Sequence, residues 1–259
     1  MRDLLNDLDA GSRQPDPMRA AREAMKPVQP KRFYKEVSVA EGEGGFQVHL
    51  DGRPARTPGR AVLALPTAAA AAIVAEEFDA QGETMDLATM SAMRLANTAI
   101  DGVAADPQAV AEDILRYVGT DLICYRAASP ENLVLRQAER WDPLVDWAAA
   151  EVGANLVLAE GVMHVEQPKS AIAAVDAWLR ARREPMRLAA LHVMTTLTGS
   201  AVLALAMDAG RLSADEGWAL ACLDEDWNAE QWGRDSEAET MRNARRRDLV
   251  AAARRSAAL

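Results

Sequence analysis

The chain of 259 residues has 39 acidic against 29 basic side chains, a formal net charge of -10, and two cysteines. This charge argues against non-specific binding to nucleic acid or to anionic membrane surfaces, since both are themselves negatively charged. A chain of this length can bury roughly 75% of its unfolded surface, so it can build a core without disulfides.

Residues 1–30 combine four prolines with mixed charge, and we expect them to form a mobile leader. The segment lacks the apolar stretch of a secretory signal, and its acidic residues argue against a mitochondrial transit peptide. We therefore expect neither kind of targeting signal.

Residues 31–66 carry the β signals of the chain. Apolar and polar residues alternate at 37–39 and at 46–50, and a glycine-rich turn at 42–45 separates these runs. Asp51 and Gly52 then follow as a second turn signal, which is typical of hairpins. A small antiparallel sheet is predicted here, and the apolar segment 154–166 could return strands to it.

After Pro66 the pattern becomes helical and remains so over 67–259. The predicted helices begin at capping residues or prolines, and several end at glycine. They cover 67–81, 91–102, 106–119, 129–141, 142–153, 169–183, 186–198, 200–209, 214–232 and 236–254. The predicted fold class is therefore α+β, with a small N-terminal antiparallel β-rich domain followed by a larger multihelical domain.

The longest uncharged run, 188–207, approaches the length that spans a bilayer. Polar residues such as His192 and Thr195 lie in this run, so we predict a buried helix that breaks near Gly199. Ser200 would cap its second half. Membrane insertion is not expected.

The sequence contains no P-loop, dinucleotide fingerprint, nucleophile elbow or zinc-binding motif. Its three histidines are far apart, and Cys124 and Cys222 each lie in an apolar run, as buried free thiols do. These observations predict a protein that is not an enzyme, with no catalytic residues, cofactor or metal.

Residues 218–239 hold three of the six tryptophans among many carboxylates. On a single helix, Glu225 would lie in the middle of a stripe formed by Trp218, Cys222, Ala229 and Trp232. Such a carboxylate either pairs with an internal arginine or waits at a recognition surface for a donor from a partner. Both interpretations remain open. The candidate partner-binding residues are Trp218, Glu225, Trp232, Asp235 and Glu237.

Six segments carry a family resemblance in this order: RFYK (32–35), LDGRPARTP (50–58), RLANTAID (94–101), TDLICYRA (120–127), WDPLVDW (141–147) and LDEDWNAEQWGRDSEA (223–238). They resemble the assembly chaperones of the F-type ATP synthase catalytic head, the kind that holds the free alpha subunit. The resemblance implies a non-enzymatic, ATP-independent chaperone that masks the alpha interface until alpha pairs with beta. We expect it to act as a monomer.

Two residues depart from the family pattern: Phe78 stands where a tryptophan is expected, and Ser91 where a proline is expected. Both changes concern packing and leave the implied function in place.

The alternative is a small-molecule-binding protein or enzyme with a pocket between the sheet and the helices. Arg53, Arg56, Asp121 and Tyr125 would line that pocket, because their segments are dense in polar groups. The same four residues could equally serve turns and hydrogen bonds between the two domains.

Overall fold

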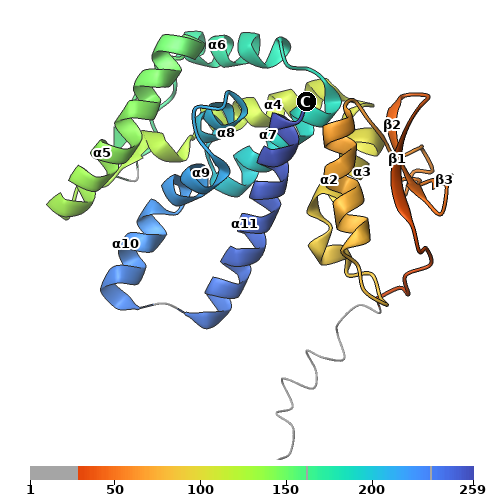
Figure 1. The fold of residues 1–259 in the computed structure, drawn as a ribbon. Coiled ribbons are helices and arrows are strands. Elements are labelled where there is room, and N and C mark those ends of the chain that lie inside the picture. Colours follow the sequence, from red (N-terminus) through yellow and green to blue (C-terminus); the bar gives the residue numbers. More distant parts are fainter. Residues whose placement is uncertain (1–28, 162, 234) are drawn as a thin grey trace, which may run out of the picture.

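The computed structural model describes residues 29–161, 163–233 and 235–259. An antiparallel β region lies at one end, and helices build the rest of the molecule (Figure 1). The predicted α+β fold class, with the β region N-terminal to the helices, is confirmed. Residues 1–28 of the predicted leader lie outside the described residues.

The N-terminal sheet is organised around β2 (Gly45–Leu50), which pairs antiparallel with β1 (Val37–Gly42), β3 (Arg53–Pro54) and β4 (Ala64–Leu65). The predicted hairpin turn forms between β1 and β2. At Gly45 a side chain would meet the Leu65 carbonyl oxygen at 2.4 Å, and φ is +121°, so this turn requires glycine. The buried face of the sheet packs against α2.

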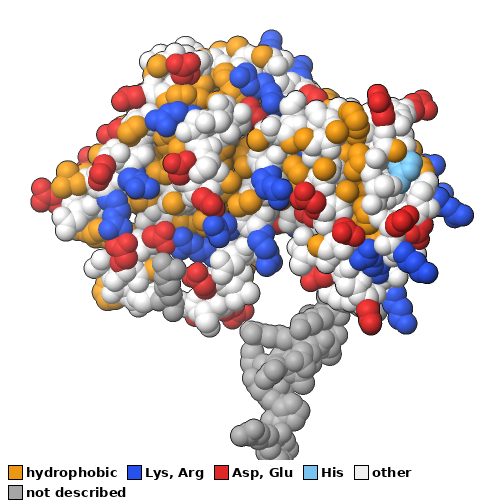
Figure 2. Space-filling model, viewed as in Figure 1, with side chains coloured by type: hydrophobic (Ala, Val, Ile, Leu, Met, Phe, Trp, Pro, Cys, Tyr) orange, Lys and Arg blue, Asp and Glu red, His pale blue; other side chains and the backbone are white. Residues whose placement is uncertain are grey.

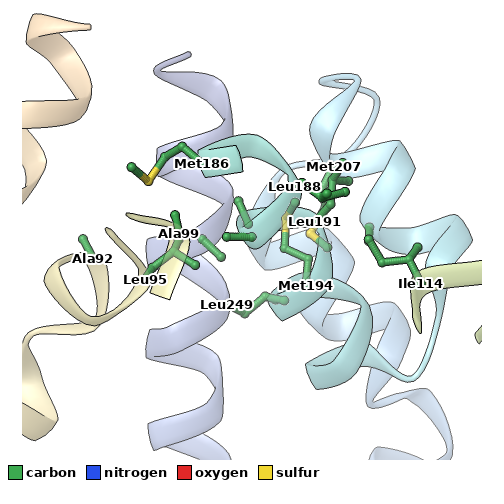
Figure 3. Packing of buried hydrophobic residues seen from close by; sticks show 14 of the residues in the cluster. Ala92, Leu95, Ala99, Ile114, Met186, Leu188, Leu191, Met194, Met207 and Leu249 are labelled. Carbon is green, nitrogen blue, oxygen red and sulfur yellow. The ribbon is translucent and has the colours of Figure 1, made fainter. Parts of the chain in front are cut away.

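The helical part has α7 (Pro185–Thr198) at its centre, and α3, α4, α8 and α11 pack against it. Leu188, Leu191 and Met194 of α7 meet Leu95 of α3 and Leu249 of α11 in the core (Figure 3). The remaining α-helices are α2 (Ala68–Asp79), α3 (Ser91–Thr98), α4 (Pro107–Val118), α5 (Glu131–Trp147), α6 (Lys169–Arg180), α8 (Ala201–Asp208), α9 (Ala214–Ala221), α10 (Leu223–Trp232) and α11 (Ser236–Ala257). Short helical turns are η1 (Leu87–Thr89), η2 (Ala99–Val103), η3 (Leu122–Cys124) and η4 (Ala148–Val152).

The long uncharged run forms two buried helices, as predicted. Gly199 ends α7 in the left-handed region with φ 69°, and the Ser200 hydroxyl accepts a hydrogen bond from the Leu203 N–H at 3.0 Å. Within the described ranges, no helix is both long and apolar enough to cross a membrane.

The prediction of separate helices on either side of residue 142 is wrong, because α5 runs straight through Pro143. Asp142, which was expected to cap the second helix, instead accepts a hydrogen bond from Arg126 at 2.7 Å. Pro143 and Glu139 are both exposed, so water can reach the Glu139 carbonyl that lacks its usual donor.

The described residues of the segment 154–166 pair outside the N-terminal sheet. They contribute β6 (Ala159–Glu160), which pairs parallel with β5 (Tyr125–Arg126) in a separate two-stranded sheet. The side-chain amide of Gln167 bonds both the N–H and the carbonyl of Val157, at 2.9 and 2.8 Å. These backbone groups are therefore satisfied without a strand partner.

Asp121 connects two chain segments at the centre of the fold. Its fully buried carboxylate accepts hydrogen bonds from the N–H of Ile123 at 3.3 Å and from the N–H of Val202 at 3.0 Å. It thereby caps η3 and satisfies an N–H in the first turn of α8. Burial raises the pKa of this carboxyl to about 6.

This raised pKa predicts a specific pH dependence of stability. The folded pKa lies above the unfolded value of about 3.9, so the folded state binds the Asp121 proton more tightly. This contribution to stability is present at low pH and is lost as the pH rises toward the folded pKa. The free energy of unfolding of the wild type, relative to Asp121→Asn, should therefore fall by about 2 kcal/mol between about pH 4 and pH 7. Urea unfolding of both proteins measures it, and a pH-independent difference would contradict this assignment.

Candidate functional site

The stretch 218–232 forms two helices rather than the single helix predicted. Cys222, with φ -94° and ψ 11°, separates α9 from α10. Trp218 and Cys222 are buried, whereas Glu225 and Trp232 are exposed. The stripe predicted to join these residues does not form, because the helical wheel assumed one continuous axis through Cys222.

Charged contacts, more than apolar burial, position α10. Leu223 is the single buried residue of this helix. Arg136 of α5 donates two hydrogen bonds to Glu230, both at 2.9 Å, and its guanidinium lies 4.8 Å from the centre of the Trp227 ring. A helix held in this way buries little apolar surface and can adjust its position at modest cost.

An ion pair joins α10 to α11, and a side-chain cap begins α11. Arg242 of α11 donates to both carboxylate oxygens of Asp226 at 2.6 and 2.9 Å, and this hydrogen bonding raises the pKa of the guanidinium. Asp235 caps α11 by accepting from the N–H groups of Glu237 and Ala238 at 2.9 and 2.8 Å.

A groove with a volume of about 520 Å³ runs between α10 and α11. Trp232 is 87% exposed and Met241 is 65% exposed beside it, so two large apolar side chains lie in water at one site. Figure 1 shows the hairpin of α10 and α11 extending from the helical body. The lining residues are Glu225, Asn228, Ala229, Trp232, Gly233, Asp235, Ala238, Glu239, Met241, Arg242 and Arg245. We call the groove that these residues line the α10–α11 groove.

Three of the five predicted partner-binding residues meet in this groove: Glu225, Trp232 and Asp235. Trp218 is instead buried in the core, beneath the Arg245 guanidinium. Glu237 is exposed on the first turn of α11, outside the lining of the groove.

Glu225 is an exposed acid of the groove. Within the part of the chain that the structure describes, it forms no ion pair, whereas the neighbouring Asp226 takes the arginine of α11. The internal salt bridge considered for Glu225 is therefore formed by Asp226.

Met241 is a groove residue that the sequence reasoning missed. It lies eleven residues, about three helical turns, before the buried Ala252, on the same face of α11. The buried stripe of α11 thus continues past the core to a side chain that is mostly exposed. The sequence does contain a signal for this residue, because Met241 is a lone large apolar residue in the polar stretch MRNARRR.

The alternative pocket forms with only two of its four predicted residues. Arg53 and Arg56 line a groove between the sheet and the helices, but Asp121 is buried at the start of α8. The Tyr125 hydroxyl lies 3.1 Å from His164 on yet another part of the surface. Among the described residues, no group of three His, Cys, Asp or Glu side chains could hold a metal.

The two cysteines are buried free thiols, as predicted. Burial raises the pKa of Cys124 to about 12 and that of Cys222 to about 11, so both are protonated and unreactive at neutral pH.

Comparison with known proteins shows that this chain is similar to chaperones in sequence and in structure. The sequence model of the ATP12 chaperone protein family matches residues 31–149. The crystal structure of Atu1473 from Agrobacterium tumefaciens is 52% identical, with a TM-score of 0.86, over 100% of this chain and 97% of that one. The crystal structure of Atp12 from Paracoccus denitrificans is 44% identical, with a TM-score of 0.82, over 88% of this chain and 97% of that one.

The two neighbouring acids of α10 should differ in their effect on stability. Asp226→Asn removes a charge-assisted pair from the half-buried Arg242, so the free energy of unfolding should fall by about 1–2 kcal/mol. Glu225→Gln should change it by less than about 0.5 kcal/mol, because an exposed side chain is replaced by one of the same shape. Chemical denaturation of both variants measures this, and equal losses would show that Glu225 is also a structural residue.

Proposed function

This chain belongs to the ATP12 chaperone family, and we propose that it is an assembly chaperone that binds the unassembled alpha subunit of F-type ATP synthase. It masks the alpha interface until alpha pairs with beta, and it does so without ATP, catalysis, a cofactor or a metal. The extent of the similarity to Atp12 carries this proposal, since the match spans nearly the whole of that protein.

The α10–α11 groove supplies the surface that such a chaperone needs. Protein interfaces depend on a few large anchors, and tryptophan is prominent among them. Trp232 and Met241 offer apolar anchors, and Glu225 offers a carboxylate to a donor of the client. A hydrogen bond of that kind to a charged group contributes about 1.5–3 kcal/mol when it is desolvated.

The sparse apolar packing of α10 fits a role in client binding. Leu223 alone is buried, so small shifts of the helix would expose little additional core. The groove can therefore adapt to a client while α11 remains anchored.

The proposed setting is a monomer in the bacterial cytoplasm, with the alpha subunit as partner. A net charge of -10 disfavours nucleic acid and anionic lipid as competing partners, because each would repel this surface.

Light scattering of purified alpha subunit during dilution from denaturant tests the proposal. The wild-type protein should suppress alpha aggregation at an equimolar ratio, and adding magnesium and ATP should not change the result. Trp232→Ala should weaken suppression about tenfold or more, as expected for the loss of an interface anchor.

Leu135→Ala is the matched control, because this leucine is 60% exposed on α5, outside the groove. It should behave as the wild type. Aggregation that proceeds equally with and without the wild-type protein would refute the proposed function.

A further inference from the structure

A second groove lies at the other end of the molecule, between the N-terminal sheet and the helices α2 and α3. Its volume is about 840 Å³. Three of the six family-like segments, which are distant in sequence, come together here, since Phe33, Arg53 and Asn97 all line it. We call it the sheet groove. In Figure 1 the sheet and α10 lie on opposite sides of the molecule.

The sheet groove has an apolar floor and apolar side chains at its mouth. Leu50, Phe78 and Met93 are buried in its lining. Phe33 is 73% exposed and Leu87 is 46% exposed. The Phe33 ring makes an edge contact with Tyr34, with 5.2 Å between the ring centres, and most of its surface remains in water. An exposed aromatic residue over an apolar cleft is typical of a protein-binding site.

Two of the polar groups of this groove are cationic. Arg53 and Arg56 line it, and neither forms an ion pair with a carboxylate of the described chain. Asp51, the acid of the lining, already accepts hydrogen bonds from the N–H groups of Lys35 and Glu36 at 2.9 and 2.8 Å. Arg56 donates one hydrogen bond to the Arg60 carbonyl at 2.8 Å, and both guanidinium groups lie at exposed positions where a partner's carboxylates can reach them.

This charge stands out in an acidic protein. Residues 31–60 hold six lysines and arginines against four acids, although the whole chain has a net charge of -10. Figure 2 shows Lys and Arg side chains at the end of the molecule where the sheet lies, interspersed with Asp and Glu side chains. The charged residues that line the α10–α11 groove are of both signs: Glu225, Asp235 and Glu239 with Arg242 and Arg245.

The side-chain oxygen of Asn97 is a further polar atom at this groove. The Nδ2 of Asn97 donates to the Met93 sulfur at 2.9 Å, whereas its Oδ1 is buried and has no hydrogen-bond partner among the described residues. Buried polar atoms are nearly always satisfied, so this oxygen is suited to accept from a donor that a bound segment brings.

We propose that the sheet groove is a second docking site for the client, and that it binds a segment with a large apolar side chain next to carboxylates. The apolar side chain would pack between Phe33 and Leu87, and the carboxylates would pair with Arg53 and Arg56. This inference rests on the proposed function. Two separate sites fix the orientation of a client, because the client must present a matching segment to each of them.

The affinity of full-length variants for immobilised, purified alpha subunit tests the proposal. Arg53→Glu with Arg56→Glu should raise the Kd about tenfold, because attraction to the client is replaced by repulsion. Phe33→Ala should raise it by a similar factor through the loss of the apolar anchor. Both changes lie at exposed positions, and an unchanged melting temperature confirms that the variants are folded.

The matched control is Lys169→Glu with Arg183→Glu, which makes the same change in net charge at exposed positions near the ends of α6. The Kd of this control for alpha should remain close to that of the wild type. Added salt should weaken binding by the wild type more than binding by Arg53→Glu with Arg56→Glu, because salt screens the attraction that only the wild type has.

The outcomes separate this inference from the proposed function. If the sheet-groove variants bind as the wild type does while Trp232→Ala weakens binding, the second site is refuted and the proposed function stands. If Phe33→Ala alone weakens binding, the acidic character of the segment is refuted. If the wild type does not bind alpha at all, both proposals fail.

Discussion

The position of the candidate site depends on how the C-terminal half of α11 is anchored. There Leu249 and Ala252 are buried against the core, and the fully buried Arg255 donates to the Ala92 carbonyl of α3 at 2.9 Å. Burial lowers the pKa of Arg255 to about 10, and the nearby Glu77 carboxylate counteracts this effect. Glu77 in turn accepts from two N–H groups at the start of α3. The Arg255 hydrogen bond and the apolar packing therefore hold α11 against α3.

This anchoring explains why the α10–α11 hairpin can present apolar side chains to water. Met241 lies on the exposed half of α11 and Trp232 at the end of α10, and the packed half of α11 offsets the free-energy cost of exposing them. Because α11 also contacts α3, the same helix connects the helical body to the end that carries the sheet groove. The two grooves are thus connected through α11, which contacts α3 at one end and forms the α10–α11 groove at the other.

Local chemistry decided which features could be predicted from the sequence. The turn at Gly45, the break at Gly199 and the cap at Ser200 were predictable, because each needs a particular backbone conformation or hydroxyl at that position. The helix break predicted before Pro143 was wrong, because an exposed helix face tolerates proline when water replaces the lost N–H donor. No glycine or proline marks the break at Cys222, so the wheel drawn through it was wrong.

The candidate site was predictable in part. A tryptophan-rich acidic stretch pointed to recognition, but only tertiary packing shows that Trp218 is buried and Trp232 exposed. Asp226 pairs with Arg242 because of the way in which α10 and α11 pack together, and residue spacing in the sequence does not reveal that packing. The sheet groove combines Phe33, Arg53 and Asn97 from separate segments, so it exists only once the chain is folded.

Hydrogen–deuterium exchange of the full chain, alone and in complex with purified alpha subunit, tests the central claim most directly. If the α10–α11 groove binds the client, backbone amides of residues 223–245 should exchange more slowly in the complex, because a bound client reduces local opening. Unchanged exchange across 223–245, with protection confined to other helices, would contradict the account.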